Sequence, residues 1–105
     1  MEIYGIKTCD TCRKAIKALP HASFVDVRVD GMPASVLSRA LSRFEGGLVN
    51  TRSTTWRGLS EDERQEPPAD LLVAHPTLMK RPLIVDGAQM HLGWTKDVQR
   101  DLGVD

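Results

Sequence analysis

The chain has little of what marks several large classes of protein. Its 105 residues include only two cysteines and five aromatic side chains, so the core must be built mainly from Leu, Val, Ile and Ala. No apolar run approaches the roughly 20 residues that a membrane-spanning helix requires. Neither sign of charge is in excess, because 14 basic residues balance 14 acidic ones. The whole-chain charge therefore gives no indication of binding to nucleic acid or to a membrane.

The N-terminus lacks the basic segment followed by a long apolar one that a secretory signal contains. We therefore expect a cytoplasmic protein, where thiols stay reduced and a close cysteine pair is more often catalytic or metal-binding than structural. The length suits a single domain over residues 1–105, because two domains would each be too small to be stable. The neutral charge and ordinary composition favour a monomer.

The apolar pattern at the two ends of the chain predicts a β-α-β unit and a β-hairpin. Asp86-Gly87 is the hairpin signal, because this dipeptide suits the tight turn between antiparallel strands. The β-α-β unit implies a parallel strand pair with a right-handed crossover, and the hairpin adds antiparallel strands. The expected elements are a strand over 2–6, a helix over 13–19, a strand over 24–29, and hairpin strands over 83–85 and 89–92.

The middle of the chain predicts a helical insertion over about 33–75. Pro33 suits the first turn of a helix that ends at a Gly-Gly pair, and residues 48–58 are polar and irregular. Ser60, with a glutamate three residues on, has the spacing of a capping box. Asp70 is the expected cap of a further helix, and Thr95 the expected cap of the last one. The fold class is therefore α/β (α+β), with a mixed sheet and helices on its faces.

Cys9 and Cys12 lie between a predicted strand and a predicted helix, the context in which Cys-x-x-Cys is a redox motif. Unpaired N–H groups and the helix dipole favour negative charge at this position and lower the pKa of a thiol. The cationic side chains of Lys7, Arg13 and Lys14 act in the same direction, although Asp10 opposes them. Cys9 is nearer the helix start, so we expect it to be the more acidic and more exposed thiol.

Cys12 allows two interpretations. One turn into the helix, it is close enough to attack a mixed disulfide formed on Cys9. Alternatively it is a small buried hydrophobic residue, and Cys9 works alone. A structural zinc site is disfavoured, because it needs four ligands and this pair supplies two, while His75 and His91 are too far apart for a finger-type histidine pair. No metal is therefore expected.

Three ordered segments resemble the thioredoxin-like arsenate reductase (ArsC) family, which also contains Spx. The first segment reads Ile-Tyr-Gly-Ile-Lys-Thr-Cys-Asp-Thr-Cys-Arg-Lys-Ala. The second reads Asn-Thr-Arg-Ser-Thr-Thr-Trp-Arg, and the third reads His-Pro-Thr-Leu-Met-Lys-Arg-Pro-Leu-Ile-Val. The second segment looks especially like the YffB branch of the family. The resemblance covers nearly the whole chain and implies a thioredoxin-like fold.

The resemblance also implies a set of functional residues. Cys9 matches the family's nucleophilic cysteine, and Arg13 the arginine of its Cys-x-x-x-Arg motif. Arg52 and Arg81 match active-site arginines, whose planar guanidinium groups hold a thiolate and bind an oxyanion or a glutathione carboxylate. Pro82 falls where thioredoxin-like folds place a cis-proline that faces the nucleophile. With Cys12, these residues form the expected site.

Two departures from the family pattern bear on the substrate. Arsenate reductases of this family have a histidine four residues before the nucleophile, where this chain has Gly5. They also have a third arginine after the hairpin, where this chain has Trp94, which we interpret as a packing residue. The site thus lacks an imidazole to support the thiolate and one arginine to hold the oxyanion. Both departures count against arsenate as the substrate.

The resemblance to the YffB branch implies a glutathione-dependent thiol reductase, with glutathione as co-substrate and no bound cofactor. Arsenate reduction is the alternative within the same class. A second alternative is a redox-sensing regulator of the Spx kind that binds RNA polymerase and uses the Cys-x-x-Cys pair as its switch. Direct binding to nucleic acid or membrane is not expected in any of these cases.

Overall fold

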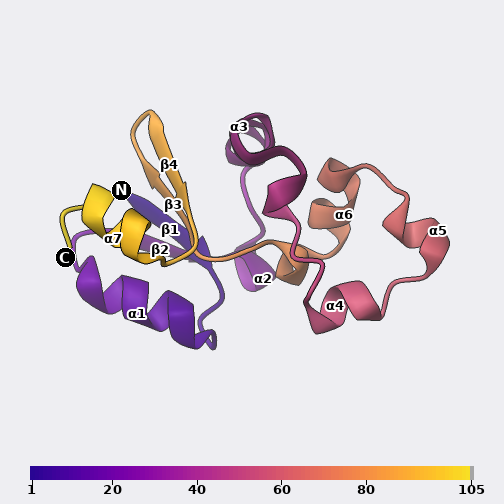
Figure 1. Cartoon of the computed structure of the whole chain (residues 1–105), viewed down its shortest axis with the longest axis horizontal. Helices are drawn as coiled ribbons and strands as arrows, with labels where there is room; N and C mark the ends of the chain where they lie inside the picture. The colour runs from indigo at the N-terminus through magenta and orange to yellow at the C-terminus, as the bar shows by residue number, and fades with distance from the viewer. Residues whose placement is uncertain (105) are drawn as a thin grey trace. The chain divides into compact units, whose positions relative to one another are not determined.

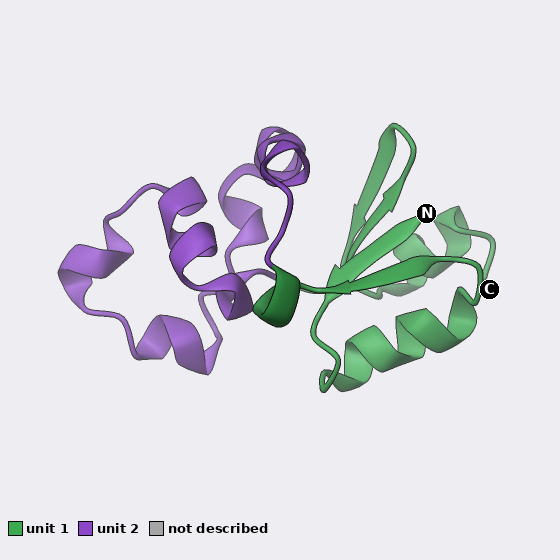
Figure 2. Cartoon of the chain, turned by 180° about the vertical axis from the view of Figure 1, so that it is seen from behind, with its two compact units in different colours: residues 1–30, 81–105 green, residues 31–80 purple. Residues whose placement is uncertain are grey.

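The computed structural model of the chain describes residues 1–104, and these form two compact units (Figure 2). Unit 1 contains residues 1–30 together with the chain from Arg81 onwards. Unit 2 contains residues 31–80, within which the helical insertion expected over about 33–75 falls. No helix formed by residues 1–104 has the length and apolarity needed to cross a membrane.

Unit 1 is built on a four-stranded mixed sheet with the strand order β2-β1-β3-β4 (Figure 1). β1 pairs in parallel with β2 and antiparallel with β3, and β3 pairs antiparallel with β4. The predicted parallel pair and the predicted hairpin are both confirmed, and Gly87 takes the positive φ of 60° that its turn requires. The elements of unit 1 are β1 (Glu2–Gly5), α1 (Asp10–Ala18), β2 (Ser23–Asp26), α2 (Val27–Asp30), β3 (Leu83–Asp86), β4 (Gln89–Leu92) and α7 (Lys96–Asp101).

One face of this sheet packs against α1 and α7. Ile3 of β1 and Ile84 of β3 are fully buried there, against Leu19 at the end of α1 and Val98 of α7. Side chains alternate between the faces of a strand, so Gly5 faces α1 on the same side as Ile3. These buried aliphatic residues hold α1 against the sheet.

The end of β2 differs from the sequence prediction. The valines of residues 24–29 predicted a strand over the whole run, but the strand ends at Asp26 and residues Val27–Asp30 form the short helix α2. The cause is the Asp26 carboxylate, whose Oδ1 accepts the N–H of Arg28 at 2.9 Å and so turns the chain. Val27 is buried after the turn, whereas Val29 is 74% exposed.

Unit 2 is helical. The Ser60–Glu63 capping box is confirmed, with both reciprocal hydrogen bonds formed, and Thr95 caps α7 of unit 1 as predicted. Pro33 is the N-cap of α3 rather than its first residue. The elements of unit 2 are α3 (Ala34–Phe44), the 3-10 helix η1 (Glu45–Leu48), α4 (Thr54–Arg57), α5 (Glu61–Arg64), α6 (Pro68–Ala74) and the 3-10 helix η2 (Pro76–Leu78).

Two predictions for unit 2 were wrong. The segment 48–58 is not wholly irregular, because Thr54–Arg57 form α4, whose first turn is capped by the Ser53 hydroxyl accepting from the N–H of Trp56. Asp70 does not cap α6, because the helix already begins at Pro68, where the missing N–H of proline costs no hydrogen bond. Asp70 lies in the first turn instead, where a negative charge is favourable.

Candidate functional site

Cys9 is the N-cap of α1 and follows β1 after a short loop. Its N–H donates to the carbonyl of Ile6 at 3.0 Å, and its own carbonyl accepts from the N–H of Arg13 at 3.0 Å. The sulfur therefore lies at the positive end of a nine-residue helix, where the first N–H groups have no partner within the helix. The predicted position of the thiol at the helix start is confirmed.

The loop before Cys9 is held from two sides. The Lys7 N–H donates to Asp26 Oδ2 at 3.0 Å, and the Lys7 carbonyl accepts from Arg13 Nε at 3.1 Å. Asp26 pairs with Gly5 in the parallel register, so its carboxylate lies directly beside the end of β1. Hydrogen bonds from the backbone N–H groups of Lys7, Arg28 and Val29 hold the pKa of the Asp26 carboxyl below its ordinary value and outweigh the opposing effect of burial.

Asp26 is a residue of this site that the sequence reasoning missed. The expected strand over 24–29 ran through it, so it counted as one more strand residue. The sequence did contain a signal for it. An aspartate at the carboxyl end of a parallel strand lies at the edge of the sheet where functional groups gather. Arg13 was expected from the resemblance to lie at the thiol, and the structure shows its Nε bonded to the loop that carries the thiol.

The surroundings of Cys9 favour its thiolate. Partial burial raises the pKa of this thiol, but hydrogen-bond donors outweigh that effect and hold the pKa below its ordinary value. The donors are the backbone N–H and the thiol of Cys12, the guanidinium of Arg81 and the backbone N–H of Thr11. Each of them stabilises negative charge on the sulfur more than it stabilises the neutral thiol. Cys9 also keeps part of its surface accessible to solvent.

Cys12 has the opposite environment. It is the third residue of α1, and none of its surface is exposed. Burial, together with the neighbouring Cys9, raises the pKa of the Cys12 thiol to about 11. The two cysteines are both reduced, so at neutral pH the site combines an acidic thiol with a buried proton donor. This ordering of the two thiols is the one that the sequence predicted.

Arg81 and Pro82 complete the part of the site in unit 1. The peptide bond between them is cis, as the resemblance implied for this position. Pro82 is fully buried, and its carbonyl accepts from the N–H of Gly93 at 2.8 Å. The structure thus brings Arg81 to Cys9 from the chain segment that leads into β3, which the spacing in the sequence alone could not establish.

Arg52 belongs to unit 2, in a turn just before α4. Its N–H donates to Asn50 Oδ1 at 3.0 Å, and the Asn50 carbonyl accepts from both the N–H and the hydroxyl of Ser53 at 3.2 and 2.8 Å. The Asn50 N–H in turn donates to the Leu78 carbonyl at 2.8 Å. The turn is well fixed within unit 2, and the Arg52 side chain on it is exposed.

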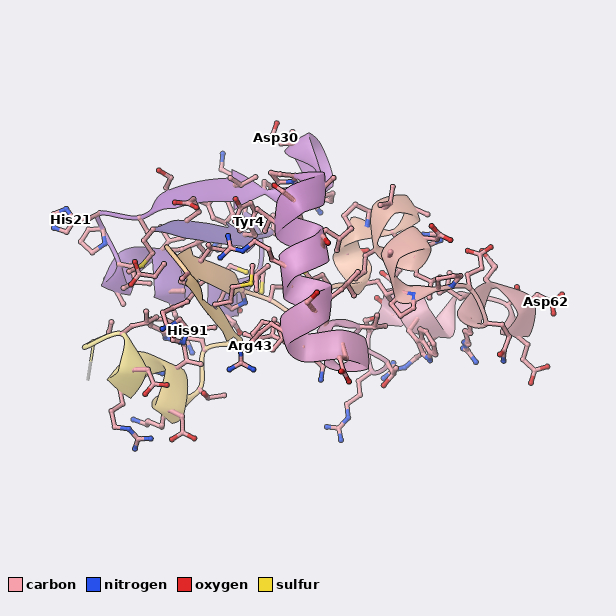
Figure 3. All side chains as sticks on the ribbon, turned by 90° about the horizontal axis from the view of Figure 1, so that it is seen from above. Tyr4, His21, Asp30, Arg43, Asp62 and His91 are labelled. Carbon is pink, nitrogen blue, oxygen red and sulfur yellow. The ribbon has the colours of Figure 1, made fainter. Side chains whose placement is uncertain are left out.

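Other candidate residues lie elsewhere. Trp94 is half-buried and packs against the cluster of Ile3, Leu19, Ile84 and Val98, which agrees with a packing role. His21 projects from the loop after α1, and His91 stands on β4 (Figure 3). Neither histidine is among the groups that shift the pKa of Cys9.

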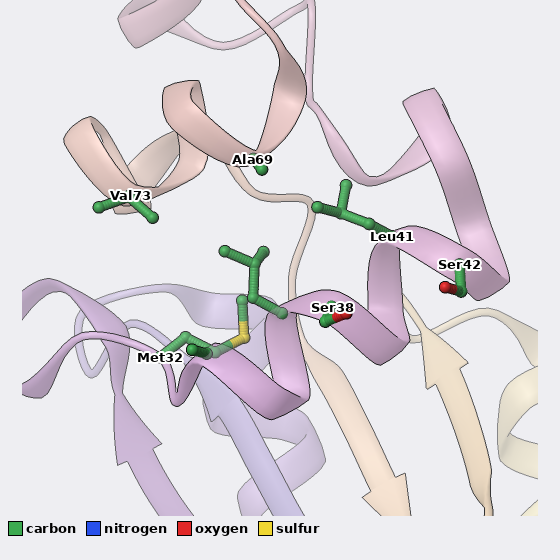
Figure 4. A pocket seen from close by; sticks show the side chains of 8 residues that line it. Met32, Ser38, Leu41, Ser42, Ala69 and Val73 are labelled. Atoms are coloured by element: carbon green, nitrogen blue, oxygen red, sulfur yellow. The ribbon is translucent and has the colours of Figure 1, made fainter.

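An apolar hollow of about 730 Å³ lies in unit 2, between α3 and α6 (Figure 4). Met32, Leu37 and Leu41 line one side of it, and Ala69 and Val73 line the other. Ser38 and Ser42 are the polar residues of its lining, and it contains none of the site residues that the sequence predicted. Its chemistry is that of a contact surface and not of a reaction centre.

Comparisons with known proteins agree with this arrangement. The model of a family described as the ArsC family matches residues 4–102. An uncharacterized protein of Haemophilus influenzae is 38% identical over 103 residues, which cover 90% of each chain. The global transcriptional regulator Spx of Bacillus subtilis is 29% identical over 105 residues, which cover 90% of this chain and 80% of the regulator. Among solved structures, a YffB protein superposes with a TM-score of 0.83 at 29% identity, covering 95% of this chain and 96% of its own.

Proposed function

The chain belongs to the ArsC family of thioredoxin-like proteins, and within that family we propose that it is a thiol–disulfide oxidoreductase that uses glutathione as co-substrate. The observation that carries this proposal is the position of Cys9. Its sulfur is accessible, lies at a helix N-terminus and is surrounded by donors that lower its pKa. A thiolate in such surroundings is the nucleophile of thiol–disulfide exchange.

The reaction begins with attack of the Cys9 thiolate on one sulfur of a mixed disulfide between glutathione and a second thiol. A bond forms between Cys9 and the glutathione sulfur, the original sulfur–sulfur bond breaks, and the second thiol leaves as its thiolate and takes a proton. The Arg81 guanidinium stabilises the charged sulfur before the attack. A second glutathione thiolate then attacks the glutathione sulfur, so that oxidised glutathione forms and Cys9 leaves as its thiolate. Alternatively, Cys12 loses its proton and attacks the Cys9 sulfur, which releases reduced glutathione and forms a Cys9–Cys12 disulfide. Two further glutathione thiols reduce that disulfide and leave as oxidised glutathione.

Arg52 and Arg81 are the proposed anion-binding groups for this substrate. Glutathione carries two carboxylates, and a guanidinium binds a carboxylate through two parallel hydrogen bonds. Pro82 is the proposed contact for the substrate backbone beside Cys9. The roles of Arg13 and Asp26 are to hold the loop that carries Cys9, because both are bonded to Lys7.

The test is turnover of a glutathionylated peptide by the full chain and by its Cys9→Ser and Cys12→Ser variants. We expect Cys9→Ser to lose the activity completely. Mass spectrometry after exposure to oxidised glutathione should show an adduct on Cys9. An adduct that persists only in Cys12→Ser would assign Cys12 as the resolving thiol. No turnover by the unmodified chain, or equal turnover by Cys9→Ser, would contradict the proposal.

A second candidate function is suggested by the similarity to Spx. Cys9 and Cys12 fit a redox switch, and a regulator of this kind would bind RNA polymerase without turning over a substrate. Co-purification with RNA polymerase, measured beside glutathione turnover, separates the two. Binding to RNA polymerase without turnover of the glutathionylated peptide would favour the regulator over the enzyme.

Arsenate reduction remains the third possibility, and two residues oppose it. Gly5 supplies no imidazole, and the half-buried Trp94, which packs against the core, stands where the resemblance places a third arginine. We expect no arsenate-dependent oxidation of glutathione by this chain. A rate that depends on both arsenate and Cys9 would overturn that expectation.

A further inference from the structure

The sulfur of Cys12 packs directly against Gly5. A Cβ atom added to Gly5 would lie 2.5 Å from Cys12 Sγ, 3.3 Å from Cys12 Cβ and 3.5 Å from Cε1 of Phe24. The first distance is far below van der Waals contact. Gly5 is not at a turn, and its backbone is that of an ordinary strand residue at the end of β1. Glycine is therefore favoured at position 5 because the Cys12 sulfur occupies the adjacent space, and not because of the backbone conformation.

The Cys12 side chain is enclosed by its neighbours. The residue lies inside α1, so its backbone is fixed, and its side chain is completely buried. The sulfur fills the space that any side chain at position 5 would enter. This is the position at which the resemblance to arsenate reductases places a histidine. A side chain at position 5 would require the Cys12 sulfur to move.

We propose that Gly5 is a positioning residue of the thiol site: its missing side chain seats the Cys12 thiol so that its S–H donates to the Cys9 thiolate. In this chain the second thiol thus takes both the space and the task that a side chain at position 5 would otherwise have. The inference deepens the proposed function, because it rests on Cys9 being the nucleophile.

The helix geometry supports this role for Cys12. Cys9 is the N-cap and Cys12 is the third residue of α1, so both cysteines lie in the first turn of the helix. The backbone N–H and the thiol of Cys12 are both among the groups that lower the pKa of Cys9. A thiol is a weak donor in water, but it is stronger where solvent is excluded, and Cys12 is fully buried.

The charges agree with a donor role. The Cys12 thiol keeps its proton at neutral pH, because burial and the neighbouring Cys9 raise its pKa to about 11. A protonated thiol can donate to a thiolate, whereas a second thiolate would repel it. The positive charge of Arg81 acts to lower the pKa of the Cys12 thiol, but burial outweighs it, so the thiol keeps its proton.

The test compares the ionisation of Cys9 in four chains: the unmodified chain, Gly5→Ala, Cys12→Ala and the double variant. The pH dependence of the rate of alkylation, followed for Cys9 by mass spectrometry, reports its pKa. We expect Gly5→Ala and Cys12→Ala each to slow alkylation at neutral pH by about threefold, which corresponds to about half a pKa unit. In the double variant, the methyl group at position 5 should not slow alkylation of Cys9 any further, because the Cys12 thiol is already absent.

Two further variants serve as controls. Gly46→Ala adds the same methyl group where nothing lies within 4 Å, and it should leave the rate unchanged. Cys12→Ser keeps a hydroxyl donor and should retain most of the low pKa that Cys12→Ala loses. Thermal unfolding of the four chains gives a second readout: Gly5→Ala should lower the midpoint in the unmodified chain more than in Cys12→Ala, where the sulfur that blocks the methyl group is missing.

The inference is overturned if Gly5→Ala and Cys12→Ala leave the alkylation rate of Cys9 unchanged. It is equally overturned if their effects on the rate add fully in the double variant. If Gly5→Ala does not fold, equal alkylation rates for Cys12→Ala, Cys12→Ser and the unmodified chain overturn it. None of these measurements uses glutathione. The role of Gly5 can therefore be confirmed even if glutathione is not the co-substrate, and glutathione can be the co-substrate even if Gly5 has no such role.

Discussion

The guanidinium of Arg81 lowers the pKa of the Cys9 thiol, although the two residues lie in the two separate chain segments of unit 1. Cys9 lies at the start of α1, and Arg81 lies two residues before β3. The sheet joins these segments, because β1 and β3 are antiparallel neighbours. The thiol site is therefore assembled by the strand pairing, and its chemistry depends on both segments.

Replacing Arg81 by methionine should raise the pKa of Cys9. The change removes the charge and the hydrogen bond while keeping a long side chain, so the thiolate loses one of its donors. The alkylation rate of Cys9 at neutral pH should fall by about tenfold, as expected for a shift of about one pKa unit. Arg100→Met on α7 is the matched control, since Arg100 pairs with Asp97 on the surface. Equal rates for the two variants would refute a role for Arg81 in ionisation.

Replacing Asp26 by alanine should loosen the loop that carries Cys9. The variant loses the acceptors of the Lys7 and Arg28 N–H groups, at a cost on the order of 1 kcal/mol in the free energy of unfolding. Asp26→Asn keeps one carbonyl acceptor, so its free energy of unfolding should fall by less than that of Asp26→Ala. Amide hydrogen exchange at residues 7 and 28 measures the effect directly. Unchanged exchange in Asp26→Ala would contradict this account of the loop.

The same carboxylate gives a pH dependence of stability. Its pKa is lower in the folded chain than in the unfolded one, so its contribution is fully present above the unfolded value of about 4 and is lost as the pH falls through the lower, folded value. As the pH falls below about 4, the unmodified chain should therefore lose more stability than Asp26→Ala does. Urea unfolding at several pH values tests this, and parallel curves would show that Asp26 contributes nothing.

Replacing Arg52 by alanine should weaken binding of a glutathionylated substrate without changing the ionisation of Cys9. The side chain belongs to unit 2 and is not among the groups that shift the pKa of Cys9. Loss of one charge-assisted contact corresponds to a rise in KM of roughly tenfold. Arg57→Ala, also exposed in unit 2, should leave KM unchanged. A similar rise in both variants would indicate general charge attraction instead of a binding site.

Replacing Trp94 by alanine should destabilise the protein and leave the thiol chemistry intact. The half-buried ring packs against Ile3, Leu19, Ile84 and Val98, so truncation should lower the free energy of unfolding by about 2–3 kcal/mol. Trp94→Phe should lose less. The alkylation rate of Cys9 should be the same in all three chains. A lower turnover in Trp94→Phe at unchanged stability would show that the indole contacts substrate.

Much of the fold could be predicted from the sequence because its signals are local. The Asp-Gly turn of the hairpin, the Ser60–Glu63 capping box and the Thr95 cap each depend on residues a few positions apart, and all three are confirmed. The errors arose where one side chain overrides an apolar pattern. Asp26 ends a run of β-branched residues and begins α2, and Pro68 begins α6 two residues before the expected cap.

The site was predictable only in part. The position of Cys9 follows from a strand, a thiol and a helix in sequence, and the structure confirms it. The fit between Gly5 and Cys12, and the hydrogen bonds from Asp26 and Arg13 to Lys7, depend on how α1 and β2 pack against β1. Such distances between elements cannot be read from spacing along the chain. Sequence comparison with arsenate reductases showed only that a histidine was missing at Gly5, and the structure shows what occupies its place.

The most direct test of the account is the full pH titration of both thiols in the unmodified chain, by alkylation rate with each cysteine identified by mass spectrometry. We predict two separate steps: Cys9 ionises below the ordinary thiol value of about 8.5, and Cys12 ionises near 11. That result would establish Cys9 as a thiolate nucleophile with a protonated neighbour. A Cys9 step at or above the ordinary value, or a reversed order of the two cysteines, would contradict the central claim.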